Sequence, residues 1–205
     1  MTRPILQDSP SQPAVYKSLG LSTLLRFLRD DRKPTILDLG PALGANVEFW
    51  SRHQCRLHIE DFYRDFIART SSENKESRAS IFADLLAFNE ELSFDIVLTW
   101  DLFNYLDLTQ LEGLVRHVSR FCKPGAALFA LISSQPDIPD QPTVFRILDT
   151  ERMVYETRTQ ITRPCPRHQP REVAKAMGLF QVSSSFLLRN GIQEYVFVRG
   201  EDPRP

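Results

Sequence analysis

The chain has 205 residues, enough for one well-buried α/β domain and too few for two full ones. Its formal net charge is −1. Proteins that bind nucleic acid or anionic membranes usually have an excess of basic residues, so we expect neither partner. Three well-separated cysteines and four scattered histidines argue against a disulfide framework and against a metal site. Without a signal-like N-terminus or an apolar run of about 18 residues, we expect a cytoplasmic protein.

The N-terminal part of the chain predicts an arm followed by a helix. Residues 1–13 contain three prolines among polar residues, which favours a flexible arm that could close over a site. From Ala14 to about Asp30, apolar residues recur near helical spacing and predict a helix. We expect a single domain over residues 14–200 and a short tail over residues 201–205.

The main signal lies in residues 35–50. The apolar run over residues 35–39 predicts a short buried strand, and Gly40 and Gly44 then supply a tight turn in which the backbone can approach a ligand. An amphipathic helix follows, with Val47 and Trp50 expected to face inward. A strand, a glycine turn and a helix N-terminus together present free backbone N–H groups, and such turns commonly hold nucleotide-like cofactors.

An acid precedes this turn. Asp38 comes two residues before Gly40, where the end of a parallel strand meets the ligand crevice. The pattern Asp-x-Gly-x-Ala-x-Gly resembles the first motif of the class I, Rossmann-like S-adenosylmethionine-dependent methyltransferases, in which the middle position is usually glycine. The resemblance implies that the methionine end of the cofactor is held by Asp38, Gly40, Pro41, Ala42 and Gly44. Ala42 is the departure from the family pattern, because its methyl group lies where the backbone would approach the ligand.

A second strand is predicted from Cys55 to Ile59, and two acids follow it. Carboxylates at the end of the second strand of a nucleotide-binding βαβ unit can accept hydrogen bonds from ribose hydroxyls. Asp61 lies 23 residues after Asp38, a workable spacing, and Glu60 is the competing candidate. The pair could equally be a solvated start to the next helix, where acids are favoured.

After a predicted helix over residues 62–68 and a polar stretch, residues 81–83 predict a short third strand. Asp84 would stand at its end. In the family that this chain resembles, the acid after the third strand meets the adenine amino group and the next backbone amide meets a ring nitrogen, which implies Asp84 and Leu85. An N-cap role for Asp84 is just as consistent with the residues.

Residues 94–106 begin as a near-continuous apolar strand of the parallel-sheet type and end in polar residues. The segment is similar to the fourth strand of the methyltransferases, whose following residues flank the methyl donor. Trp100 and Asp101 would then lie at the crevice, with Tyr105 one helical turn later. Trp100 could instead be a core residue.

The chain after residue 106 predicts two further helices and three further strands. Residues 108–121 predict an amphipathic helix, Lys123-Pro124-Gly125 ends it, and residues 127–132 predict a fifth strand. A helix over residues 171–177 precedes two strands, residues 180–188 and 194–199, around a glycine turn. This ending is similar to the reversed hairpin that closes methyltransferase sheets.

Residues 134–172 are irregular and correspond to the family's variable, acceptor-side segment. His168 is the one histidine there and could serve as a general base. The arginines of this segment could receive an anionic group of the acceptor, although a solvated face balanced by glutamates is the simpler interpretation.

The resemblance covers residues 24–199 and implies an α/β, Rossmann-like three-layer sandwich. Its mostly parallel sheet would have seven strands in the order 3-2-1-4-5-7-6, one of them antiparallel, with helices on both faces. The implied activity is methyl transfer from S-adenosylmethionine to a small molecule, as in enzymes of class EC 2.1.1. Methyl transfer needs no fixed catalytic residue, so only Asp101, Tyr105 and His168 are candidates. The alternatives are a catalytically inactive, methyltransferase-like binding or scaffold protein and another Rossmann nucleotide-binding protein.

Overall fold

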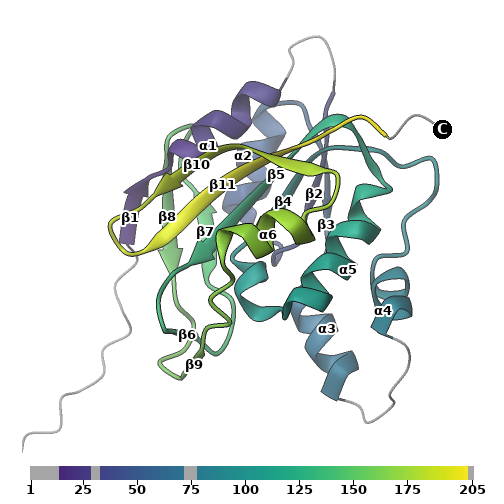
Figure 1. Ribbon diagram of the computed structural model, residues 1–205. Helices are drawn as coiled ribbons and strands as arrows, with labels where there is room; N and C mark the ends of the chain where they lie inside the picture. Colours follow the sequence, from purple (N-terminus) through teal and green to yellow (C-terminus); the bar gives the residue numbers. More distant parts are fainter. Residues whose placement is uncertain (1–13, 29–32, 72–77, 203–205) are drawn as a thin grey trace, which may run out of the picture.

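The computed structural model describes residues 14–28, 33–71 and 78–202, and these form an α/β fold around one large sheet (Figure 1). In the described residues this sheet has six strands in the order β10-β11-β5-β4-β2-β3. The strands β2, β3, β4 and β5 run parallel to one another, and β11 lies antiparallel to both β5 and β10. The strand bounds are β2 Thr35–Asp38, β3 Arg56–Ile59, β4 Phe94–Trp100, β5 Cys122–Ser133, β10 Phe180–Leu187 and β11 Ile192–Arg199.

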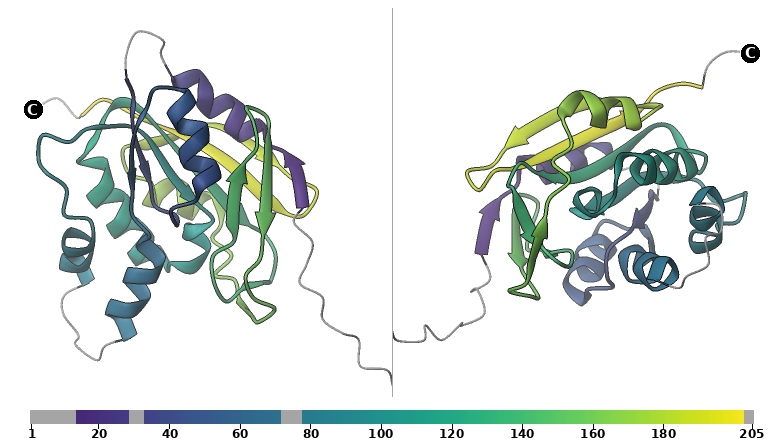
Figure 2. Two further views of the ribbon diagram at one scale, coloured as in Figure 1. Left: turned by 180° about the vertical axis from the view of Figure 1, so that it is seen from behind. Right: turned by 60° about the horizontal axis from the view of Figure 1, so that its bottom comes forward.

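Helices cover both faces of this sheet (Figures 1 and 2). Neighbouring residues of one strand alternate between two cores: Val97 of β4 packs with the α3–α6 side, whereas Ile96 and Leu98 pack with α1 and α2. The two cores explain the near-continuous apolar runs of the central strands, which are buried on both faces. The helix bounds are α1 Leu19–Leu24, α2 Gly44–Arg52, α3 Phe62–Ser71, α4 Arg78–Leu85, α5 Leu108–Ser119 and α6 Pro170–Ala176.

The predicted third strand is wrong. Residues 81–83 lie within α4, so the seven-stranded order is not confirmed, and β3 is the edge strand of the described sheet. The ring of Phe82 stacks at 6.0 Å from Phe62 and 6.1 Å from Phe66, both on α3, and it closely approaches Gly113 of α5. An apolar run of three residues has no period that separates a strand from a helix, and here packing between helices decides.

The predicted first helix is only partly correct. Residues 14–17 form strand β1, and helix α1 begins after Ser18, whose side chain accepts a hydrogen bond from the backbone N–H of Leu21 at 2.9 Å. After α1, residues 25–27 form one 3₁₀ turn, η1 (Leu25–Phe27). Strand β1 pairs antiparallel with β8 (Arg152–Glu156), a partner more than 130 residues away, and such pairing cannot be read from local periodicity.

The irregular segment over residues 134–172 contains four short strands. β7 (Val144–Ile147) and β8 (Arg152–Glu156) join β1 in a three-stranded sheet, and β6 (Asp137–Pro139) pairs with β9 (Thr162–Pro164). Helix α2 is tied to β7 by Asn46, whose amide donates to the carbonyl of Phe145 at 3.0 Å and accepts from the N–H of Ile147 at 2.9 Å. Asn46 is therefore buried, and Val47, which we expected to face inward, is 41 % exposed.

The C-terminal half of the main sheet follows the prediction closely. Helices α5 and α6 lie within two residues of their expected bounds, and β10 and β11 form the expected hairpin, with Gly191 at φ 79° in its turn. Strand β5 begins earlier than expected, at Cys122, and includes Gly125 at φ 80°. The predicted arm over residues 1–13 lies outside the described residues, as does the end of the predicted tail. No helix among the described residues is long and apolar enough to cross a membrane.

Candidate functional site

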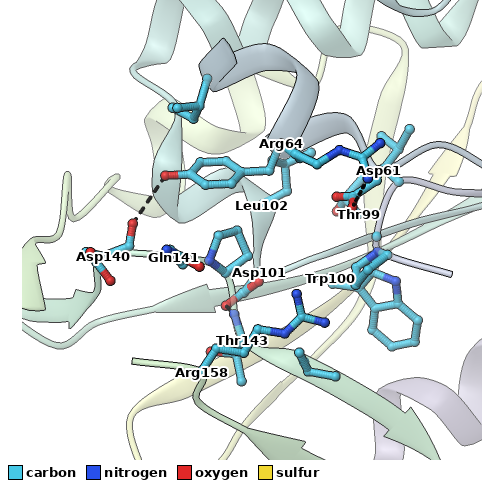
Figure 3. Close-up of a pocket in the computed structure, with 17 residues that line it drawn as sticks. Asp61, Arg64, Thr99, Trp100, Asp101, Leu102, Asp140, Gln141, Thr143 and Arg158 are labelled. Atoms are coloured by element: carbon cyan, nitrogen blue, oxygen red, sulfur yellow. Dashed lines mark hydrogen bonds and ion pairs between the residues drawn. The ribbon is translucent and has the colours of Figure 1, made fainter. Parts of the chain in front are cut away.

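A cavity of about 540 Å³ lies where β2 and β4 end (Figure 3). It is lined by residues 39–41, by the start of α3, by residues 99–102 and by residues 140–144, together with Arg158. Figure 3 shows Asp61 and Arg64 on one side of the cavity, Thr143 and Arg158 on the other, and Asp101 between them. The carboxyl ends of parallel strands are the usual location of ligand sites in open α/β sheets.

Asp38 lies beneath the glycine turn and is 2 % exposed. One of its carboxylate oxygens accepts hydrogen bonds from the backbone N–H of Gly40 at 2.9 Å and from Nε1 of Trp100 at 2.6 Å. Burial raises the pKa of Asp38 to about 6, although both hydrogen bonds oppose the shift. A Cβ atom at residue 40 would lie 2.8 Å from Cδ1 of Trp100, so the close approach that requires glycine here is the approach of the indole.

Trp100 is both a core residue and part of the cavity wall. It is 5 % exposed, and its ring stacks on Phe145 of β7 at 5.8 Å and meets Phe129 of β5 edge-on at 6.1 Å. Its backbone has φ 49°, a left-handed conformation that is uncommon for a large side chain. This conformation lies at the turn from β4 into η2 (Leu102–Tyr105), with the indole packed beside Gly40. The two interpretations of Trp100 that the sequence left open are therefore compatible.

Asp101 is the most deeply buried acid that lines the cavity, at 6 % exposed. Its Oδ2 accepts a hydrogen bond from the backbone N–H of Thr143 at 2.9 Å, whereas its buried Oδ1 has no hydrogen-bond partner among the described residues. Burial raises the pKa of Asp101 to about 7, and the hydrogen bonds from Thr143 limit the rise. Asp101 thus presents a group that can gain or lose a proton near neutral pH.

The two acids after β3 differ in position. Asp61 lines the cavity and pairs with Arg64 at 3.4 Å, with 27 % of the Asp61 side chain exposed. Glu60 extends the parallel pairing of β3, because its backbone N–H donates to the carbonyl of Asp38 at 2.8 Å, and its side chain does not line the cavity. Of these two acids, only Asp61 is placed to meet a ligand in this cavity.

Four other predicted cofactor residues lie outside the lining of this cavity. Asp84 is on α4 and pairs with Arg69 of α3 at 3.1 Å, and Leu85 packs against the α3–α6 core. The prediction that Asp84 stands at the end of a strand is therefore wrong. Ala42 and Gly44 are exposed and do not line the cavity, whereas Pro41 does.

Tyr105 and His168 brace the region next to the cavity and do not line it. The hydroxyl of Tyr105 donates to the carbonyl of Gln141 at 2.8 Å. Nε2 of His168 lies 2.8 Å from the carbonyl oxygen of Leu106 and 3.2 Å from that of Phe103, so this nitrogen carries the proton and donates it. Neither geometry leaves the polar atom directed at the cavity.

Sequence reasoning missed the residues that complete the cavity. Tyr63 donates from its hydroxyl to the carbonyl of Asp140 at 3.2 Å, and Thr143 binds Asp101. These contacts join α3 and the end of β4 to residues 140–144, and no periodicity within that irregular segment predicts them. The prolines and polar residues of the segment predict a loop, but they do not predict which residues the loop packs over. No group of metal-ligating side chains occurs among the described residues.

Comparison with known proteins gives a family match over part of the chain. Residues 37–130, which run from β2 into β5, match the family model described as "Methyltransferase domain". A search of curated proteins finds no match.

Solved structures are similar in fold at low sequence identity. The protein of "Conversion of a Disulfide Bond into a Thioacetal Group during Echinomycin Biosynthesis" has a TM-score of 0.53 and 12 % identity, over 96 % of this chain and 86 % of that one. The 1,6-didemethyltoxoflavin-N1-methyltransferase of Burkholderia thailandensis has a TM-score of 0.49 and 12 % identity, over 89 % and 77 %. The N-methyltransferase NodS of Bradyrhizobium japonicum has a TM-score of 0.46 and 14 % identity, over 88 % and 86 %.

The likeness to the protein of echinomycin biosynthesis supports the fold alone. The family match concerns the sequence, and it includes the motifs at β2 and β4. The glycine turn after Asp38 and the strand that begins Phe94-Asp95-Ile96-Val97 both lie within the matched residues. Residues 37–130 are therefore similar in sequence to a methyltransferase domain, and the described residues share the fold of the first of these solved structures.

Proposed function

We propose that the protein transfers a methyl group from S-adenosylmethionine to a small molecule bound in the cavity at the ends of β2 and β4. The observation that carries the proposal is the position of this cavity, between the glycine turn and the end of β4, both of which lie within the methyltransferase match. Its volume of about 540 Å³ falls in the range of small-molecule sites.

The residues around the cavity fit the ribose side of the cofactor best. The carboxylate of Asp61 follows β3, is partly exposed and faces the cavity, as an acceptor of hydrogen bonds from ribose hydroxyls must. Gly40 and Pro41 line the side where the methionine end would lie. Asp38 already accepts two hydrogen bonds at one oxygen, so we assign it to holding the turn and the indole of Trp100 in place.

The cofactor supplies an electrophilic methyl group, and the chain's own residues have to orient the acceptor and exclude water. Residues 140–144 lie over the end of β4 and are held there by the hydrogen bonds from Tyr63 and to Asp101. Positioning of this kind can lower the activation barrier by about 7–11 kcal/mol when the reacting groups are well oriented. Tyr105 and His168 support the same region from outside the lining, so among the predicted catalytic candidates Asp101 is the one we retain.

A second function is a methyltransferase-like binding or scaffold protein without activity. Ala42 replaces the usual middle glycine, and the indole of Trp100 packs directly beside Gly40, where the family approaches its ligand. If the indole keeps that position, the methionine end of the cofactor has less room. A nicotinamide- or other nucleotide-binding Rossmann protein is a weaker alternative, because the match is to a methyltransferase domain.

Calorimetric titration with S-adenosylhomocysteine tests the proposal. We expect micromolar binding to the wild-type protein and an affinity about tenfold lower for Asp61→Ala, because a carboxylate hydrogen bond to ribose is lost. Asp65→Ala is the matched control, since Asp65 lies on α3, the helix that follows Asp61, also pairs with Arg64 and does not line the cavity. No binding by the folded wild-type protein would favour the inactive scaffold, and retained affinity for NADH would favour the nicotinamide alternative.

A further inference from the structure

Asp101 has a hydrogen-bonding capacity that the described residues leave unused. Its Oδ1 is buried, lies on a cavity-lining residue and has no hydrogen-bond partner there, and no described cation forms an ion pair with it. Leaving a buried carboxyl oxygen unpaired costs about 1–3 kcal/mol of desolvation free energy, and more if the group is charged. An acid retained in this state is typical of a group that meets a ligand.

The hydrogen bond to Thr143 determines where a proton on Asp101 resides. The backbone N–H of Thr143 donates to Oδ2, which must therefore act as an acceptor. When Asp101 is protonated, the proton consequently sits on Oδ1. The unpaired oxygen thus offers the cavity an O–H donor in one state and a carboxylate acceptor in the other.

The ionisable groups around Asp101 leave it free to change state. Three phenols interact with it, Tyr16 from β1, Tyr63 from α3 and Tyr105 from η2, and burial raises the pKa of each, so they stay neutral. Asp61, Asp140, Arg64 and Arg158 are the charged side chains that line the same cavity with it. Burial of Asp101 among the three neutral phenols raises its pKa to about 7.

The lining also indicates what kind of ligand would complete the site. Its acids are Asp61, Asp101 and Asp140, and the buried Oδ1 of Asp140 also lacks a hydrogen-bond partner among the described residues. Of its two arginines, Arg64 is already paired with Asp61 and Asp65. Unpaired carboxyl oxygens beside aromatic and aliphatic walls favour a ligand with an apolar body and hydrogen-bond donors.

We propose that Asp101 binds the methyl acceptor and takes up its proton, and that the acceptor is an amine or ring nitrogen carrying an N–H group. The inference rests on the proposed function and names its substrate class. The nitrogen lone pair forms the new bond to the methyl carbon, the carbon–sulfur bond breaks with its electron pair left on sulfur, and the N–H proton passes to Oδ1 of Asp101. Atoms and charge balance without a further reactant.

Calorimetry with benzylamine as the probe and benzyl alcohol as its matched neutral partner tests this assignment, with and without saturating S-adenosylhomocysteine. We expect benzylamine to bind wild-type protein at least about tenfold more tightly than benzyl alcohol. At pH 7 benzylamine is a cation and should bind the carboxylate form of Asp101 without losing its own proton. Titrations in buffers of different ionisation enthalpy should then show release of about half a proton per benzylamine bound, because a group with a pKa near 7 is half protonated there. Asp101→Asn should abolish this release and weaken benzylamine binding by about tenfold.

Asp65→Asn removes the same charge outside the cavity and should leave both quantities unchanged. The Asn side chain can still accept from Thr143, and a melting curve checks that the variant is folded. Equal binding of benzylamine and benzyl alcohol, unaltered binding by Asp101→Asn, or no benzylamine binding at all would overturn the proposal. Failure of S-adenosylhomocysteine to bind would instead overturn the proposed function, since the amine titration without it reports on Asp101 alone.

Discussion

Two acidic strand ends face the same cavity and differ in almost every physical respect. After β3, Asp61 is partly exposed and paired with Arg64, whereas at the end of β4, Asp101 is buried with one oxygen unpaired. Residues 140–144 make the difference, because they cover the second acid and hydrogen-bond to it. A position at the end of a parallel strand therefore brings a side chain to a ligand site, and the segment packed above it determines the chemistry available there.

The largest expected effect is on stability at the end of β4. Trp100→Ala should lower the free energy of unfolding by about 4 kcal/mol, because it empties a packed site and removes the N–H partner of buried Asp38. Asp61→Ala, at the partly exposed strand end, should change it by less than about 0.5 kcal/mol. Urea unfolding measures both, and Trp100→Phe, which keeps an aromatic ring beside Phe145, should lose less than the alanine variant. Equal losses at the two strand ends would show that they do not differ in packing.

The next effect is a pH dependence of stability that originates at Asp101. Its pKa is about 7 in the folded protein, above its ordinary value of 3.8, so between these values the folded state binds more protons than the unfolded state. The stabilisation from protonation is complete below about pH 4 and is lost as the pH rises to 7. Between pH 4 and 7, the unfolding free energy of the wild type should therefore fall by about 3 kcal/mol relative to that of Asp101→Asn.

Urea unfolding of both proteins at several pH values measures this difference, in which contributions from other carboxyl groups cancel. Above pH 7 the difference should level off. A difference that stays constant from pH 4 to 7 would mean that Asp101 titrates as an exposed acid.

A smaller effect separates the two acids that follow β3. Asp61→Asn should weaken S-adenosylhomocysteine binding by about tenfold, or about 1.4 kcal/mol, whereas Glu60→Gln should weaken it by less than about twofold. The reason is that Asp61 lines the cavity and the side chain of Glu60 does not. Calorimetric titration of the two amide variants makes the comparison, and a larger loss for Glu60→Gln would reverse the assignment.

The smallest effect is expected at Asp84, for which the family resemblance implied contact with the adenine. It pairs with Arg69 at an exposed position on α4, so Asp84→Ala should change the unfolding free energy by less than about 0.5 kcal/mol. S-adenosylhomocysteine affinity should stay within about twofold of wild type. A tenfold loss in the same titration would restore Asp84 to the cofactor site and extend that site beyond the cavity.

The sequence by itself determined the elements whose signals are local. The parallel strands β2, β4 and β5 contain runs of apolar residues, and β3 alternates polar and apolar residues. Helices α3 and α5 have helical periodicity, and the final hairpin has its glycine turn. The strand-end rule also brought Asp61 and Asp101 to the cavity, because the carboxyl ends of parallel strands meet at one edge of a sheet.

Only the tertiary structure decided which of several compatible local states was adopted. Residues 81–83 are helical because Phe82 packs between α3 and α5, and residues 14–17 are extended because β8 pairs with them. The indole of Trp100 donates to Asp38 while its ring stacks on Phe145, which lies on a distant strand. Each of these outcomes depends on contacts between residues far apart in the chain, whose energies outweigh local propensity and leave no trace in local sequence periodicity.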